Sequence, residues 1–198
     1  MKHLCRVSAA AAAMVAAHAG LAEAHILDAS GMAFSGGFLH PIGGADHVLA
    51  MVAVGLWAAQ LGGRALWGLP VTFVLMMALG GALGMSGAPL PWVEGGILAS
   101  VLVLGALVAL ARRLPAAASM ALVGAFAVFH GHAHGAEMPL AASPYSYGLG
   151  FALATSMLHA TGIGTGVLLE RGGGFAARLI RVSGGAIVTA GILMLIGR

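Results

Sequence analysis

The sequence predicts an all-α, polytopic membrane protein, a bundle of six transmembrane helices that follows a cleaved N-terminal signal peptide. Apolar residues make up 60% of its 198 residues and charged residues only 8%, whereas soluble proteins carry about 25% charged residues. The mean hydropathy is +1.00. Long apolar runs follow one another without the period-two alternation of strands. These observations argue against a soluble domain, and the arginines are too scattered to form a nucleic-acid-binding patch.

Residues 1–24 have the features of a secretory signal peptide. A basic start and a short apolar run precede Ala22-Glu23-Ala24, which matches the small-x-small cleavage pattern. Cleavage there would leave residues 25–198 as a single transmembrane domain, with the amine and imidazole of His25 as a potential chelating pair. The alternative is an uncleaved first helix, although the run falls short of the roughly 20 apolar residues that a span needs.

Six apolar spans are expected after the leader. The breaks between them carry Gly, Pro or Arg, residues that interrupt or flank apolar helices. The expected spans are residues 36–60, 65–86, 92–111, 115–134, 146–169 and 176–196. Because small residues four apart let membrane helices pack closely, Gly80 with Gly84 and Gly162 with Gly166 are candidate contacts. With 32 glycines in the chain, chance also produces such spacings.

The distribution of charge predicts the orientation. If the mature N-terminus lies outside, the connections that face inward hold Arg64, Arg112, Arg113, Arg171, Arg178 and Arg181. The outer segments hold only one arginine, Arg198, together with Asp28, Glu94 and Glu137. This positive-inside bias agrees with an exported leader. The expected location is a bacterial inner membrane, with both mature termini on the periplasmic side.

The first polar cluster, His40-Pro41-Ile42-Gly43-Gly44-Ala45-Asp46-His47, lies within the first expected span. Ionisable groups inside a membrane are costly and indicate function. On a straight helix His40 and His47 would be about 10 Å apart along the axis, too far to share one ion. Pro41 and the glycines favour a break that could bring His40 back toward Asp46 and His47. The alternative to a metal site is a kinked helix whose histidines are hydrogen-bonded to neighbours.

The second cluster, with His130, His132, His134 and Glu137, ends the fourth expected span. On a helix His130, His134 and Glu137 share a face, whereas His132 points elsewhere. In an extended segment all three histidines could line one side. Imidazole and carboxylate ligands suit a borderline divalent cation such as nickel, cobalt or zinc. The alternative is a solvated, His-rich outer loop.

His159 is the third candidate ligand and lies beside Thr155 in the fifth expected span. A lone histidine in a helix is as often packed and hydrogen-bonded as it is a ligand. Counted from the outer end of its span, His159 would lie about 20 Å deep. His47 would lie nearer mid-depth, and the other ligands near the outer face. Such a ladder favours passage of an ion, because a structural site would form one closed shell.

These clusters resemble the sequence patterns of the HupE/UreJ family of membrane proteins. The pattern HP-x-x-G-x-DH, followed by Met and Gly, is matched by His40, Pro41, Gly44, Asp46, His47, Met51 and Gly55. The pattern FHG-x-AHG-x-E is matched by Phe129, His130, Gly131, Ala133, His134, Gly135 and Glu137. The resemblance extends to the leader, the six spans and the chain length. It implies permeation of nickel or cobalt for hydrogenases and ureases, with Ni²⁺ or Co²⁺ as the transported ion and no tightly bound cofactor.

The sequence therefore favours a permease over an enzyme. ATP hydrolysis is not expected because the chain has no P-loop, so passive permeation and coupling to protons both stay open. A membrane metalloenzyme with a His/Asp metal site and Glu137 as base is the alternative, against which the spread of ligands over depth argues. A haem protein ligated by His47 and His159 is a third possibility. The expected partners are the ion and the lipid bilayer, with no nucleic acid and an undetermined oligomeric state.

Overall fold

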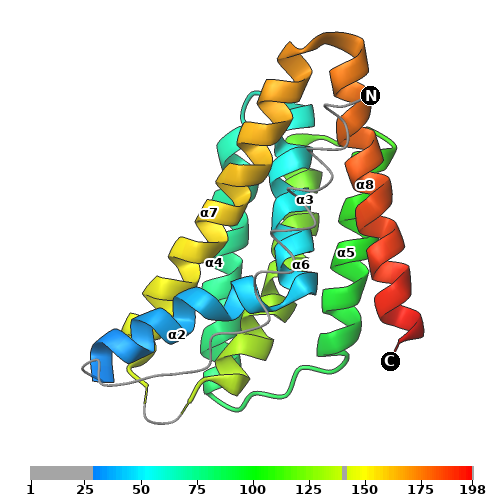
Figure 1. Cartoon of the computed structure of the whole chain (residues 1–198). Coiled ribbons are helices and arrows are strands. Elements are labelled where there is room, and N and C mark those ends of the chain that lie inside the picture. Colours follow the sequence, from blue (N-terminus) through cyan, green and yellow to red (C-terminus); the bar gives the residue numbers. More distant parts are fainter. Residues whose placement is uncertain (1–28, 140–141, 198) are drawn as a thin grey trace.

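The computed structural model describes residues 29–139 and 142–197, in which every regular element is a helix (Figure 1). In chain order the helices are α2 (Ala29–Gly43), α3 (Ala45–Leu61), α4 (Ala65–Met85), α5 (Val93–Ala109), α6 (Ala116–Glu137), α7 (Pro144–Arg171) and α8 (Gly173–Ile196). The all-α prediction is confirmed for this part of the chain. The expected signal peptide, residues 1–24, and His25 lie outside the described residues.

Helices α4 to α8 match five of the expected spans, with ends within three residues of the prediction. Four of them, α4, α6, α7 and α8, are long and apolar enough to cross a membrane, whereas α5 is apolar but only 17 residues long. Large apolar side chains such as Leu75, Leu149 and Leu193 are exposed on the outside of the bundle. An apolar exterior of this extent is typical of a surface that meets lipid.

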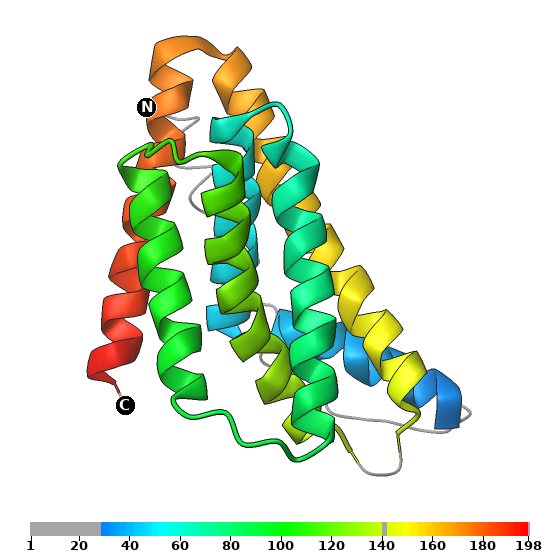
Figure 2. The same cartoon turned by 180° about the vertical axis from the view of Figure 1, so that it is seen from behind.

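The long helices pack in pairs. Helix α4 packs on α6, α5 packs on α8, and both α2 and α3 pack on α7. Figures 1 and 2 show α2 crossing one end of the bundle, next to the start of α7. The connections after α4 and α6 lie at this same end, which we call the α2 end. The turns after α3, α5 and α7 lie at the opposite end, which we call the arginine end because it carries Arg64, Arg112 and Arg171.

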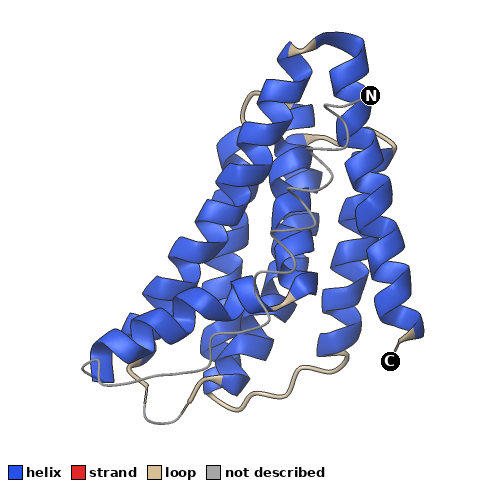
Figure 3. Ribbon diagram, in the orientation of Figure 1, coloured by secondary structure: helices blue, strands red, loops and turns tan. Residues whose placement is uncertain are grey.

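The expected first span, residues 36–60, is not one straight helix. It is divided between α2 and α3, which are bent by 80° at their junction. Figure 3 shows the helical ribbon interrupted there. Gly44 at the break has an extended backbone, with φ −94° and ψ 116°. The break falls within the Pro-Gly-Gly segment that was expected to loosen the helix. Together, α2 and α3 are long and apolar enough for one membrane segment, either a broken span or a re-entrant loop.

Glycines set the spacing of the paired helices. A Cβ atom on Gly84 would lie less than 3 Å from the backbone of α6, and one on Gly131 would collide with the backbone of α4. Where α3 packs on α7, Gly55 of α3 and Gly162 of α7 face each other in the same way. Close backbone approach at small residues is how membrane helices gain packing energy without a hydrophobic driving force. The expected roles of Gly84 and Gly162 as helix contacts are therefore confirmed.

At the arginine end, side-chain hydrogen bonds fasten α3 to α5. The buried Trp57 donates from Nε1 to the carbonyl oxygen of Arg112 at 2.9 Å, and Gln60 donates from Nε2 to the carbonyl oxygen of Val108 at 3.0 Å. Arg181 of α8 donates to the carbonyl oxygen of Ala109 at 2.9 Å. The acceptors are carbonyl groups in the last turn of α5 and in the connection that follows it. The arginine end is consequently tied together by both packing and hydrogen bonds.

We expect the substitution Gly162→Ala to lower the free energy of unfolding by about 1–3 kcal/mol, because the added methyl group overpacks the contact with Gly55. Gly164→Ala is the matched control, since a Cβ there meets no heavy atom within 4 Å. Both changes raise helix propensity equally. Thermal unfolding of the purified proteins in detergent measures the difference. Equal unfolding temperatures for the two variants would contradict the packing role of Gly162.

Candidate metal site

The break at Gly44 brings the two sequence clusters together around His134. The rings of His40, on α2, and His47, on α3, both contact the ring of His134, on α6, with centroid distances of 4.6 and 4.2 Å. On a straight helix the first two residues would be separated by about two turns. The bend instead brings both rings into contact with one imidazole, that of His134. A direct approach of His40 to His47 stays a prediction.

The outer part of the site lies at the α2 end and is partly exposed. His40 Nε2 lies 3.4 Å from Glu137 Oε2, with 37% and 59% of the two side chains exposed. One possible ligand atom from each of His40, His134 and Glu137 lies within 4.8 Å of the others. These residues border a cavity of about 540 Å³ that Asp46 and Glu94 also line. The group presents two imidazole nitrogens and a carboxylate oxygen, donor atoms that suit a divalent cation.

Asp46 determines how the ring of His47 is presented. Its Oδ1 accepts a hydrogen bond from the backbone N–H of His47 at 2.9 Å and lies 3.0 Å from Nδ1 of the same residue. An ionised carboxylate can only accept, so the neutral ring must carry its proton on Nδ1. The lone pair of His47 then lies on Nε2, the atom in contact with Nε2 of His134. Carboxylates orient metal-binding histidines in this way in many proteins.

His130 continues the site inward. Its ring lies 4.5 Å from that of His47, centroid to centroid, and it is fully buried. Ser100 Oγ donates to the carbonyl oxygen of Ile97 at 2.6 Å and is 2.8 Å from His130 Nε2. Because the hydroxyl has one proton, which it gives to Ile97, His130 Nε2 must donate to Ser100. Its lone pair then lies on Nδ1, which has no hydrogen-bond partner among the described residues.

His159 is the innermost histidine of the site. It is 1% exposed, and within the described part of the chain neither ring nitrogen has a hydrogen-bond partner. The ring of Phe73 contacts both His159 and His130, at centroid distances of 5.0 and 5.6 Å. A buried polar group left without a partner costs about 1–3 kcal/mol. Such groups are rare in native proteins, and ligand binding is one reason to retain them.

His132 lies apart from the other histidines. Helix α6 continues to Glu137, so the segment is not extended and His132 points away from the face that carries His130 and His134. Its Nε2 bonds to the carbonyl oxygen of Ala88 at 2.7 Å. His132 therefore tethers α6 to the connection that follows α4.

The structure thus joins seven of the eight expected site residues in one series. From the α2 end inward, the series is Glu137, His40, His134, His47 with Asp46, His130 and His159. Sequence reasoning missed Ser100, which bonds to His130, and Phe73, which lies between His130 and His159. It treated Glu94 only as a marker of orientation, although Glu94 lines the cavity. A single serine or phenylalanine in an apolar helix carries no pattern that could have identified it.

Comparison with known proteins identifies the family of the chain. Residues 9–194 match the family described as HupE / UreJ protein. Over 178 residues the chain is 46% identical to Protein HupE of Rhizobium leguminosarum bv. viciae, a match that covers 89% of this chain and 91% of that protein. No solved structure matches the chain significantly. The chain belongs to the HupE/UreJ family.

Proposed function

We propose that this protein is a membrane permease that takes up Ni²⁺, or alternatively Co²⁺, into the cytoplasm for the maturation of hydrogenase or urease. The observation that supports the proposal is the graded burial of one series of imidazole and carboxylate side chains. The Glu137 side chain is 59% exposed at the α2 end, His47 is 5% exposed further in, and His159 is 1% exposed in the core. A series that passes from solvent to the interior suits an ion in transit.

The proposed topology has six spans in a bacterial inner membrane. The bent pair α2–α3 serves as one span and the short α5 as another, beside the four long helices. The arginine end faces the cytoplasm, in keeping with the positive-inside rule. The α2 end, where the site is exposed, then faces the periplasm together with both mature termini. Nickel would enter at Glu137 and His40.

The donor atoms of the site favour a borderline divalent ion. Imidazole suits nickel, cobalt and zinc, whereas Mg²⁺ and Ca²⁺ prefer sites made of oxygen ligands. The only cysteine, Cys5, lies in the expected leader and cannot supply a thiolate to the mature chain. Both the donor set and the family, which is associated with nickel and cobalt handling, support nickel or cobalt as the cargo.

Each residue of the series has a proposed role in uptake. The exposed carboxylate of Glu137 attracts the hydrated cation, and the imidazoles of His40 and His134 replace part of its water. His47, oriented by Asp46, receives the ion from His134 because their Nε2 atoms are in contact. His130 and then His159 take it deeper, each with a ring nitrogen that has no partner among the described residues.

A membrane metalloenzyme is the less favoured function. A catalytic metal is commonly held by three protein ligands at one place, with a fourth position open to water. The trio of His40, His134 and Glu137 has that number of ligands, but three more histidines lead inward from it. An enzyme would have no use for this inward series. The family is also transporter-like rather than a family of enzymes.

Uptake of radioactive nickel by cells that express the protein tests the proposal. We expect His47→Ala and His134→Ala each to reduce initial uptake at least tenfold, because each removes a ligand from the middle of the series. His132→Ala is the matched control and should retain uptake within twofold, since the hydrogen bond of His132 among the described residues goes to the backbone carbonyl of Ala88. Membrane expression of all variants must be equal. Uptake by the parent no higher than by empty cells would refute nickel transport, and cobalt would be the next ion to test.

Loss of the Asp46 carboxylate should weaken nickel binding through its effect on His47. We expect Asp46→Asn to raise the nickel dissociation constant of the purified protein by about 10–100-fold, the usual effect of removing a carboxylate that orients a ligand histidine. Glu170→Gln is the control. It removes one carboxylate charge near the last residue of α7, at the arginine end and far from the site, and should leave the dissociation constant unchanged. Calorimetric titration in detergent compares them. An unchanged constant for Asp46→Asn would mean that Asp46 does not control the presentation of His47.

A further inference from the structure

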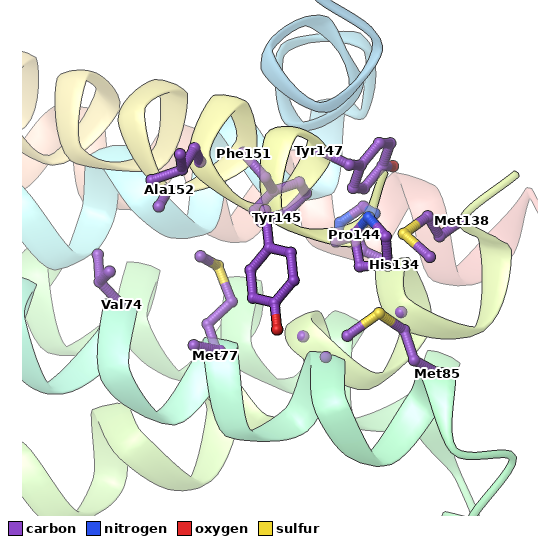
Figure 4. A pocket seen from close by; sticks show the side chains of 16 residues that line it. Val74, Met77, Met85, His134, Met138, Pro144, Tyr145, Tyr147, Phe151 and Ala152 are labelled. Atoms are coloured by element: carbon purple, nitrogen blue, oxygen red, sulfur yellow. The ribbon is translucent and has the colours of Figure 1, made fainter. Parts of the chain in front are cut away.

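A second cavity lies on the other side of His134. Its volume is about 460 Å³, and its walls come from α4, the end of α6 and the start of α7. Figure 4 shows the methionines Met77, Met85 and Met138 on these walls, together with the ring of His134. We call the first cavity, of about 540 Å³, the polar cavity because the carboxylates of Asp46, Glu94 and Glu137 line it. Among the described residues that line the second cavity, none is acidic.

Packing of α4 on α6 brings two of these methionines to the same level. The two helices run in the same direction, with Gly81 against Gly135 and Gly84 against Ala136. Met85, the last residue of α4, and Met138, directly after α6, therefore follow matching positions at the α2 end. Met77 lies deeper, where its sulfur accepts a hydrogen bond from Thr155 at 3.7 Å. In Figure 4 Met85 and Met138 lie near His134, whereas Met77 lies farther from it.

These methionines border open space instead of filling it. Methionine is common in cores because its flexible chain occupies irregular gaps. Here the gap remains, and Met85 is 45% exposed. His134 is 6% exposed, and its Nδ1 has no hydrogen-bond partner among the described residues. Thioether sulfurs favour soft cations such as Cu(I), whereas the carboxylates of the polar cavity favour harder ions.

We propose that Met85, Met138 and His134 form a second cation site that binds soft monovalent ions, Cu(I) or Ag(I). Because His134 borders both cavities, an ion held here removes His134 from the series that leads through the polar cavity. Binding of the two ions would then be negatively cooperative. Bound Ag(I) lowers the affinity of the protein for Ni²⁺, and bound Ni²⁺ lowers its affinity for Ag(I) by the same factor. The site stands on its own residues and does not depend on nickel transport.

Titration of the purified full-length protein with Ag(I), in chloride-free detergent buffer, tests the proposal by calorimetry. The test variant is the double substitution Met85→Leu with Met138→Leu, a swap that conserves volume and removes both sulfurs. The control is Met120→Leu with Met157→Leu, which removes two sulfurs away from the cavity. We expect the test variant to bind Ag(I) at least tenfold more weakly than the parent, and the control to stay within twofold of it.

Two results would overturn the proposal. One is Ag(I) binding that is absent in the parent or equal in the parent and the test variant. The other is binding that His134→Ala abolishes while the two-methionine variant keeps it, which would place Ag(I) in the histidine series alone. Unfolding temperatures equal to that of the parent show that each variant is folded. The titration needs no nickel, so it decides the matter even if the protein does not transport nickel.

Where the parent does take up nickel, a second measurement follows. We expect Ag(I) to inhibit nickel uptake by the parent, and the two-methionine variant to keep its nickel uptake but require at least tenfold more Ag(I) for the same inhibition. Equal inhibition of parent and variant would contradict the coupling through His134.

Discussion

Helices α4 and α6 approach each other so closely that no side chain fits between their backbones at Gly84 and Gly131. This approach also fixes which way α6 faces. Its glycine face is held against α4, so the neighbouring residues His130 and His134 must point to another side, where the rings of His40 and His47 meet them. In lipid no hydrophobic effect drives helices together, so close packing of α4 and α6 determines where the site residues lie. The direction in which His130 and His134 point is therefore set largely by glycine contacts on another face of α6.

The two ends of the bundle differ in how they are closed. At the α2 end a cavity of about 540 Å³ reaches the imidazoles of His40, His47 and His134. Inward of His159, α3 and α7 meet at Gly55 and Gly162, and the buried Trp57 fastens α3 to α5. The described conformation therefore opens the site to one end only. Under the proposed function, an ion released toward the arginine end would have to pass this glycine contact, where the backbones of α3 and α7 leave no room for a Cβ atom.

Most of the fold could be predicted because apolar length and breaker residues determine where membrane helices begin and end. The bounds of the five helices α4 to α8 were predicted to within three residues. The helix break was expected from Pro41 and the following glycines, but its angle of 80° was not, because a bend is set by packing of α2 on α7. Sequence spacing likewise identified the two histidine clusters, but it did not predict that they contact each other in the folded protein. The contact of His47 with His134 joins residues 87 apart in the chain, and no local pattern encodes it.

The break at Gly44 has an electrostatic consequence beyond the side chains that it positions. A helix end carries a partial charge, negative where its carbonyl groups point outward and positive where its N–H groups do. Helix α2 ends at Gly43 and helix α3 begins at Ala45, and Gly43 and Gly44 both line the polar cavity. The carbonyl end of α2 thus adds negative potential at the cavity. The positive end of α3 is offset by Asp46 in its first turn. The backbone itself makes the cavity attractive to a cation before any imidazole binds it.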